Sequence, residues 1–350
     1  MPVAPADAPV TYPGQQEGDF LARDFRFVRG ETLPEVRLHY LTIGAPRRDA
    51  AGRVENAVLL LHASTSTARQ YLSPAMGPEL FGPGQPLDAA RWYVILPDGL
   101  GRGGSSKPSD GLRARFPRYG YADVVKAQHL LVTEGLGVDR LRAVAGTSMG
   151  GMHTWMWAER YPDLMDAAMP IACLPTAISG RNLLFRRIVT EAIRSDPGWQ
   201  EGAYRTPPRR WLATAPLWAM MLDSAAHLQA EAPTRQAALD LYDRLVEEAR
   251  AWDANDFLYW LESSWDYDPR PDLGKIRARV VAVNFADDAI NPPELGLAEE
   301  LVGRVPGARF VMVPAGPGTR GHHTLGLAVA WKSHLAELLA SPPGAGPPPR

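Results

Sequence analysis

Short apolar runs alternate along the chain with segments in which apolar residues recur at helical spacing. Residues 121–135 and 325–339 show the periodicity of amphipathic helices. A regular succession of buried strands and helices is typical of an α/β fold with a mostly parallel, doubly wound sheet. The runs that we predict as core strands are residues 57–61, 92–96, 141–145, 167–171, 280–284 and 309–313.

The alternation is interrupted between residues 175 and 271, where the pattern predicts several helices and no strand. This interruption indicates a lid inserted into the core. The segment holds six of the ten tryptophans, which either pack inside the lid or a dimer interface, or in a few cases line an acyl pocket. The expected organisation is a flexible segment over 1–16, a core over 17–174, the helical lid over 175–271, the second part of the core over 272–340, and a disordered tail over 341–350.

Composition narrows the classes of partner. The net charge of −2 gives no reason to expect binding to nucleic acid or to acidic membranes. The single Cys173 excludes an internal disulfide and a thiolate metal cluster. Residues 1–16 lack the pattern of a signal peptide, and no run of apolar residues is long enough to cross a membrane. We therefore expect a cytoplasmic protein that acts on a small molecule.

The sequence GTSMG at 146–150 lies between a predicted strand and a predicted helix. This is the nucleophile-elbow motif of α/β-hydrolases, in which a sharp turn presents a serine hydroxyl to a cleft. Its glycines let neighbouring backbone come close, and the helix N-terminus favours developing negative charge. The motif predicts an α/β-hydrolase fold with Ser148 as the nucleophile; the alternative is a glycine-rich turn with an ordinary serine.

A serine hydroxyl needs a base, and the base needs a carboxylate to orient it. In α/β-hydrolases these partners follow in the order serine, acid, histidine. Asp287 and Asp288 come directly after one predicted strand, and His322 and His323 follow the next. The spacing alone does not decide which member of each pair acts.

The loop after the first core strand is where this fold supplies a backbone donor for the oxyanion. We predict that the backbone N–H groups of Ser64 and Met149 form the oxyanion hole. A polar loop without that role has the same composition. Residues 101–104 lack the pattern of a phosphate or dinucleotide loop, and the remaining histidines lack metal-ligand spacing, so neither a cofactor nor a metal is expected.

Several motifs together resemble the homoserine O-acetyltransferase family over roughly residues 20–340. They are LPEVRL at 33–38, GPG and LD within 82–88, GTSMGGM at 146–152, WA at 157–158 with RYPD at 160–163, DAN at 253–255, and DAINPP at 288–293. The resemblance implies a helical lid, a homodimer whose interface we expect at the lid, and ping-pong acyl transfer by a Ser/Asp/His triad. Matched to the family motifs, Ser148, Asp288 and His322 take the catalytic positions.

Two positions depart from what the resemblance implies for binding homoserine. The family has an arginine for the substrate carboxylate where this chain has Thr190, and an aspartate for the substrate amine where it has His323. Arg186, Arg187 or Arg194 could replace the missing arginine from a neighbouring turn.

These observations leave three hypotheses in order of preference. The first is a carboxylic-ester hydrolase that works through an acyl-enzyme on Ser148. The second is an O-acyltransferase to a hydroxyl acceptor other than homoserine, for which acyl-CoA could be a co-substrate. The third is a ligand-binding protein without catalysis, although such a protein does not need a complete Ser148, Asp288 and His322 set.

Overall fold

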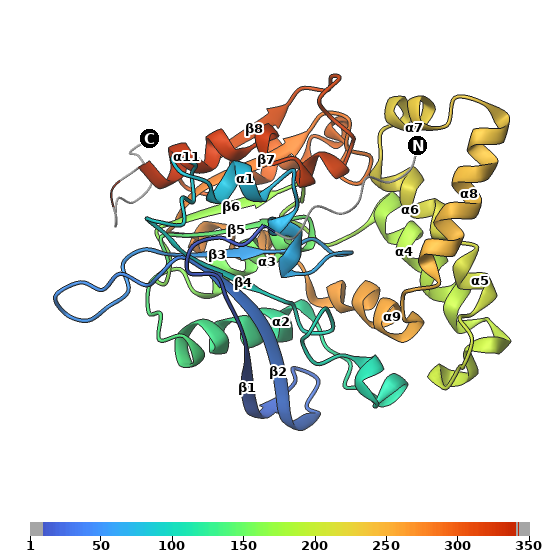
Figure 1. Ribbon diagram of the computed structural model, residues 1–350, viewed down its shortest axis with the longest axis horizontal. Helices are drawn as coiled ribbons and strands as arrows, with labels where there is room; N and C mark the ends of the chain where they lie inside the picture. Colours follow the sequence, from blue (N-terminus) through green and yellow to red (C-terminus); the bar gives the residue numbers. More distant parts are fainter. Residues whose placement is uncertain (1–9, 341, 343–350) are drawn as a thin grey trace.

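The fold is built on one sheet of eight strands, in the order β1-β2-β4-β3-β5-β6-β7-β8 (Figure 1). The computed structural model describes residues 10–340 and 342. The six strands β4, β3, β5, β6, β7 and β8, in that order across the sheet, are parallel to their neighbours. Strand β2 pairs antiparallel with both β1 and β4. The strands are β1 (Gln16–Arg26), β2 (Thr32–Ile43), β3 (Ala57–Leu61), β4 (Tyr93–Pro97), β5 (Ala143–Thr147), β6 (Ala167–Ile171), β7 (Arg279–Phe285) and β8 (Arg309–Val313).

The six predicted core strands correspond to β3 through β8, with bounds that differ by up to two residues. The hairpin of β1 and β2 was not predicted. Most residues of β1 are exposed, and only Ala22 and Phe25 in it are buried. A strand with so few buried positions shows little alternation, so its sequence does not stand out from that of a loop.

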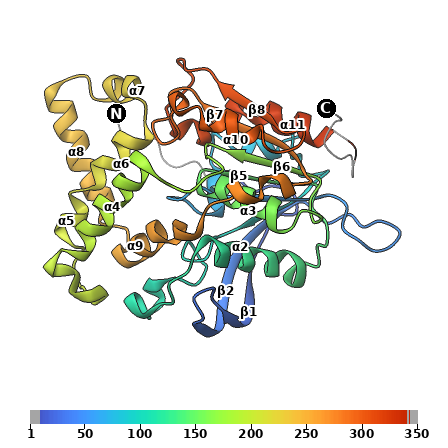
Figure 2. The same ribbon diagram turned by 180° about the vertical axis from the view of Figure 1, so that it is seen from behind.

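Helices cover both faces of the sheet, as Figures 1 and 2 show from opposite sides. Alternate side chains of a strand point to opposite faces, and accordingly Leu59 and Leu61 belong to one core cluster while Val58 and Leu60 belong to another. Side chains of α2 (Tyr121–Leu130) and α3 (Met149–Arg160) join the first cluster, which also contains α10 (Leu297–Val302). Side chains of α1 (Gly77–Phe81) and α11 (Lys332–Ala340) join the second.

The chain between β6 and β7 forms a helical insertion. Figure 1 shows most of it to one side of the sheet, with α9 nearest the core. Within it, Trp218 lies 5.4 Å from Trp260 between ring centroids, and Trp211 is buried beside Phe257, whereas Trp252 and Trp265 are exposed. Its helices are α4 (Gly180–Arg194), α5 (Arg209–Leu212), α6 (Ala215–Leu222), α7 (Ala225–Glu231), α8 (Arg235–Ala249) and α9 (Ala254–Glu262).

The ends of the chain are only partly described. The expected flexible segment over 1–16 lies outside the described residues up to residue 9; within the rest, Tyr12 is buried against Phe81 and Gln16 begins β1. The expected disordered tail lies outside the described residues except for Pro342. None of the helices in the described part of the chain has the length and apolar character needed to cross a membrane.

Candidate active site

Ser148 occupies the turn between β5 and α3. Its backbone has φ 52° and ψ −112°, a conformation that L-residues rarely adopt and that stores strain. The Ser148 N–H donates to the carbonyl of Ile171 at the end of β6, with a distance of 2.8 Å. The turn is therefore held by the neighbouring strand, and the hydroxyl is presented at the carboxyl edge of the sheet.

Close backbone contacts explain the glycines around Ser148. A Cβ atom at Gly150 would overlap the carbonyl oxygen of Leu61, and one at Gly146 would overlap the carbonyl oxygen of Gly150. Without side chains at these positions, the N-terminus of α3 packs directly on the end of β3. The loop after β3 is thereby brought next to the nucleophile turn.

His322 joins Ser148 and Asp288 in one chain of hydrogen bonds. His322 Nε2 lies 2.8 Å from Ser148 Oγ, and His322 Nδ1 lies 2.7 Å from Asp288 Oδ2. All three residues are buried, with 7%, 3% and 1% of Ser148, His322 and Asp288 exposed. With the Nδ1 proton facing Asp288, Nε2 is free to accept the serine proton. The geometry is that of a nucleophile, a base and an orienting acid.

Asp288 is held as a carboxylate by its surroundings. Burial acts to raise its pKa, but His322 and the hydrogen bonds from Asn291 and Ile290 outweigh burial and hold the pKa below its usual value. Asn291 donates from its backbone N–H and from Nδ2, at 3.2 and 3.0 Å. A carboxylate so fixed can orient the imidazole without taking its proton.

The second member of each pair makes other contacts. Asp287 Oδ2 accepts hydrogen bonds from Thr319 Oγ1 at 2.8 Å and from the Gly321 N–H at 3.0 Å. The Nδ1 atom of His323 lies 3.3 Å from Asp223 Oδ2, and its side chain is 42% exposed. The structure thus brings Asp288 and His322 to Ser148, and places Asp287 and His323 in contacts that fix the loop around them.

Ser64 and Met149 lie where donors to an oxyanion are expected. Neither backbone N–H has an acceptor among the described residues. The neighbouring Ala63 N–H donates to Gln70 Oε1 at 2.9 Å, while Gln70 Nε2 donates to Thr147 Oγ1 at 2.8 Å. Gln70, which the sequence reasoning missed, therefore ties the loop after β3 to the residue before the nucleophile. The role of the two N–H groups stays a prediction.

A cavity of about 350 Å³, which we call the nucleophile cavity, opens at Ser148. Its lining combines apolar side chains and the buried Cys173 with polar groups from α4. Its other lining residues include Met152, Leu174, Thr176, Ala177, Ile178, Arg181, Asn182, Arg186, Ile290, Asn291, Leu295 and Leu297.

Thr190 and His323, which stand at the substrate-binding positions that the family resemblance implies, do not line the nucleophile cavity. Thr190 is buried in α4, where its hydroxyl donates to the carbonyl of Arg187 at 3.2 Å. It lines a second cavity of about 580 Å³ together with Arg186, Arg187 and Arg194. Of these three arginines, Arg186 also lines the nucleophile cavity.

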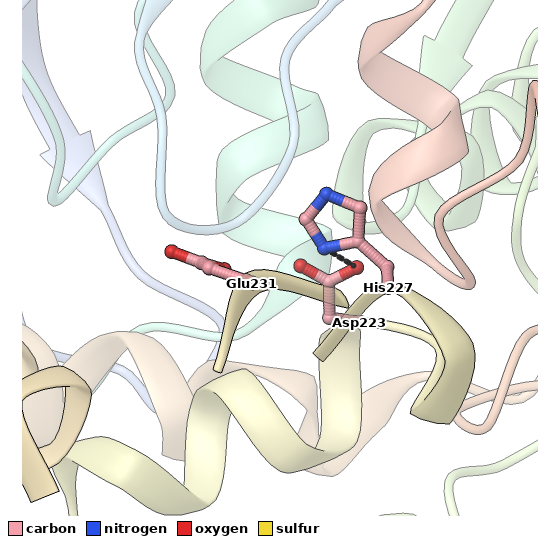
Figure 3. A group of neighbouring side chains, drawn as sticks. All are labelled: Asp223, His227 and Glu231. Atoms are coloured by element: carbon pink, nitrogen blue, oxygen red, sulfur yellow. Dashed lines mark ion pairs between the residues drawn. The ribbon is translucent and has the colours of Figure 1, made fainter. Parts of the chain in front are cut away.

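Asp223, His227 and Glu231 on and before α7 offer three potential metal ligands within 4.8 Å of one another (Figure 3). Cationic side chains already occupy both carboxylates: Arg320 Nη2 lies 2.9 Å from Asp223 Oδ2, and Arg244 pairs with Glu231. A divalent ion would have to displace these arginines, so the cluster fits ion pairing better than metal binding. Asp223 also meets His323, which links the helical insertion to the loop of His322.

Comparison with known proteins agrees with the fold and the motifs. Residues 56–318 match the sequence profile of the alpha/beta hydrolase fold family. A homoserine O-acetyltransferase of Solidesulfovibrio magneticus is 32% identical over 312 residues, which cover 75% of this chain and 76% of that protein. A probable acyltransferase of Methanothermobacter thermautotrophicus is 27% identical over 308 residues, which cover 88% of this chain and 93% of that protein.

Solved structures of an esterase and of a homoserine O-acetyltransferase are also similar to this chain. The structure of the acetyl esterase MekB is 26% identical with a TM-score of 0.78, covering 93% of this chain and 97% of that chain. The homoserine O-acetyltransferase from Bacillus anthracis has a TM-score of 0.80 at 20% identity, covering 93% and 98%, and so shares the fold. The chain belongs to the α/β-hydrolase superfamily and, within it, to the homoserine O-acetyltransferase-like family. It is an enzyme of the esterase or acyltransferase type.

Proposed function

We propose that the protein is a carboxylic-ester hydrolase that forms an acyl-enzyme on Ser148. The observation that supports this most directly is His322, which lies within hydrogen-bond distance of both Ser148 Oγ and the Asp288 carboxylate. A buried hydroxyl, imidazole and carboxylate in this order have the arrangement needed for nucleophilic catalysis.

In the acylation step, Ser148 Oγ attacks the ester carbonyl carbon while its proton passes to His322 Nε2. The carbonyl oxygen becomes an oxyanion, which the N–H groups of Ser64 and Met149 would bind; such a donor is worth about 3–4 kcal/mol where it has been measured. The carbon–oxygen bond to the alcohol then breaks. His322 returns the proton to the leaving oxygen, and the acyl group stays on Ser148.

In the deacylation step, His322 takes a proton from water while the water oxygen attacks the acyl carbon. A second oxyanion forms in the same place. The bond to Ser148 Oγ then breaks, the proton returns to Ser148, and the carboxylic acid leaves. Asp288 stabilises the imidazolium in both steps through its hydrogen bond to Nδ1.

The choice of water as acceptor is supported by the surroundings of Thr190 and His323. Transfer to an amino acid requires binding of the acceptor at high effective concentration. Neither position lines the nucleophile cavity, and the His323 ring faces Asp223. Two charged hydrogen bonds to homoserine are therefore missing from these positions, each worth about 1.5–3 kcal/mol.

The alternative is an O-acyltransferase to a hydroxyl acceptor other than homoserine. It is favoured by the curated relatives, which are named as acyltransferases. The two functions share the acyl-enzyme and differ only in the acceptor that resolves it.

The test is an assay of p-nitrophenyl acetate hydrolysis, followed by mass spectrometry of products formed from acetyl-CoA with and without L-homoserine. We expect ester hydrolysis and little or no O-acetylhomoserine. Substantial O-acetylhomoserine would show that Arg186 or another arginine binds this acceptor. A fluorophosphonate that labels the wild type and not Ser148→Ala would identify the nucleophile, whereas labelling of both would contradict the proposed mechanism.

A further inference from the structure

The loop that carries His322 is held from two sides. We call residues 319–324 the histidine loop. On the core side, Asp287, just after β7, accepts a hydrogen bond from the Gly321 N–H at 3.0 Å. On its other side the loop meets residues 222–224, the junction between α6 and α7 of the helical insertion. The place of the imidazole therefore depends on the insertion as well as on the core.

Gly321, the residue before His322, packs directly on this junction. Its φ of 59° lies in the left-handed region, where glycine is favoured. A Cβ atom at Gly321 would lie 2.8 Å from the Ser224 nitrogen and 2.9 Å from the Asp223 carbonyl carbon, closer than real Cβ atoms come. The backbone of the insertion can therefore contact the histidine loop only because position 321 has no side chain.

The Asp223 side chain adds charged contacts at the same place. It is 6% exposed, and its Oδ2 atom lies 2.9 Å from Arg320 Nη2 and 3.3 Å from His323 Nδ1. Arg320 and His323 are the residues on either side of the Gly321–His322 pair. One carboxylate oxygen of the insertion thus contacts the histidine loop both before and after the residue that carries the imidazole.

The surroundings of Asp223 keep it charged and fixed. Burial acts to raise its pKa, but the hydrogen bond and charge of Arg320, together with His323, outweigh burial and hold the pKa below its usual value. Its other oxygen, Oδ1, lies 3.2 Å from His227 Nδ1 on α7 (Figure 3). Both oxygens are therefore engaged, one within the insertion and one across to the histidine loop.

The distance of 2.8 Å between His322 Nε2 and Ser148 Oγ is the one that proton transfer depends on. A displacement of about 1 Å at a reacting group can lower a rate about 100-fold. We propose that Asp223 is a positioning residue for His322, which it holds in place by docking the insertion on the histidine loop. This proposal rests on the proposed function, because it assigns a role only if His322 is the base.

The two charged contacts of Asp223 contribute unequally. Arg320 is the closer partner and carries a permanent charge, and the packing at Gly321 does not involve a side chain of the loop. Loss of the His323 side chain alone therefore leaves the dock in place. Loss of the Asp223 charge removes the contacts on both sides of His322 at once.

The test follows the reaction of Ser148 with a fluorophosphonate in the wild type and in Asp223→Asn. Attack on phosphorus also needs the base, so the maximal rate constant of labelling should fall by about tenfold to 100-fold, while every chain is labelled at completion. The kcat for p-nitrophenyl acetate should fall as well, because His322 acts in both steps. A merely structural role predicts a smaller labelled fraction at the wild-type rate constant. That outcome, or full labelling at the wild-type rate, would overturn the proposal.

Asp243→Asn is the matched control. It removes the same charge from the exposed surface of α8, in the same insertion, and should be labelled at the wild-type rate. An equal loss in both variants would trace the effect to the overall charge of the insertion and would count against Asp223.

Arg320→Gln tests the same contact from the other side. The Arg320 side chain is 42% exposed, so this variant is available even if Asp223→Asn does not fold. Its labelling should slow by a similar factor, and the double variant should be no slower than the slower single variant, because both changes break one contact. Effects that multiply would show that the two residues act independently and would overturn the assignment.

His322→Ala separates this proposal from the proposed function. Slow labelling of His322→Ala, together with wild-type rates in Asp223→Asn and Arg320→Gln, would leave the base in place and overturn only the positioning role. Labelling of His322→Ala at the wild-type rate would instead overturn the base, and with it both proposals.

Discussion

The carboxylate of Asp287 lies 3.0 Å from the backbone nitrogen of Gly321, and this hydrogen bond ties the end of β7 to the loop that carries His322. The adjacent Asp288 instead meets the His322 ring. Two consecutive carboxylates thus act on one loop in different ways. Asp287 fixes the backbone before the histidine, and Asp288 fixes the imidazole itself.

This division predicts unequal effects of two identical changes. Asp288→Asn should lower kcat by about 10⁴-fold, because an amide favours the wrong tautomer of the imidazole. Asp287→Asn keeps an oxygen that can accept from Gly321 and Thr319, so a much smaller loss is expected. Steady-state kinetics on p-nitrophenyl acetate measures both. A larger loss in Asp287→Asn would assign the acid to the other carboxylate.

The histidine pair gives a second comparison. His322→Ala removes the base from Ser148 and should abolish measurable turnover, since loss of one triad member can cost about 10⁶-fold in kcat. His323→Ala removes only a partly exposed contact with Asp223 and should leave most of the activity. Thermal unfolding of both variants serves as the control for folding. Equal inactivation of the two would leave the base unassigned.

The close packing at Gly150 predicts a loss of both stability and activity in Gly150→Ala. The new methyl group would overlap the Leu61 carbonyl oxygen, and overpacking of this kind costs about 1–3 kcal/mol. The start of α3 must move to relieve the overlap, and Met149 moves with it. Gly274→Ala is the matched control, because a Cβ atom there meets no neighbour within 4 Å. Urea unfolding and kcat measured together would show both effects; a fully active, fully stable Gly150→Ala would contradict this packing.

His153 predicts a specific pH dependence of stability. It is buried beside the Tyr121 ring, and its Nε2 atom has no hydrogen-bond partner among the described residues. Burial, with a smaller contribution from His62, lowers its pKa to about 3. The unfolded chain binds a proton near the ordinary histidine pKa of about 6.5, while the folded protein does not. The contribution of the neutral His153 to the free energy of unfolding is therefore fully present above the ordinary histidine pKa of about 6.5. This contribution is lost as the pH falls toward 3.

In His153→Gln this proton uptake on unfolding is absent. The slope of unfolding free energy against pH should fall by up to about 1.4 kcal/mol per pH unit between those limits. Urea unfolding at several pH values measures the slope. Thr154→Ala changes a buried neighbour that does not titrate, so it should lower stability and keep the wild-type slope. An unchanged slope in His153→Gln would show that His153 is protonated in the folded protein.

The parts of the fold predicted from sequence are those with strong local signals. The strands from β3 to β8 are short runs of buried residues, and GTSMG at 146–150 has a distinctive local pattern. The β1–β2 hairpin lacked such a signal because its side chains are mostly exposed and its pairing with β4 is set at long range.

The same distinction holds for the candidate site. Ser148, Asp288 and His322 were predicted because each follows a recognisable strand, and the choice within the two pairs came from the family resemblance. Gln70 and Asp223 gave no signal, because their partners Thr147 and His323 lie far away in sequence. The second cavity, of about 580 Å³, combines residues from the β1–β2 turn, from the segment before α2, and from α4 and α9, a grouping that only the folded chain creates.

The partition between the two cavities has a practical meaning for changing what the enzyme accepts. One long side chain, that of Arg186, stands where they meet, and the other shared residues, Ala177 and Ile178, are smaller. Shortening that single side chain should widen both cavities at the place where their linings meet. A library limited to position 186 therefore offers an engineer a compact way to test the acceptance of larger esters while leaving the nucleophile turn untouched.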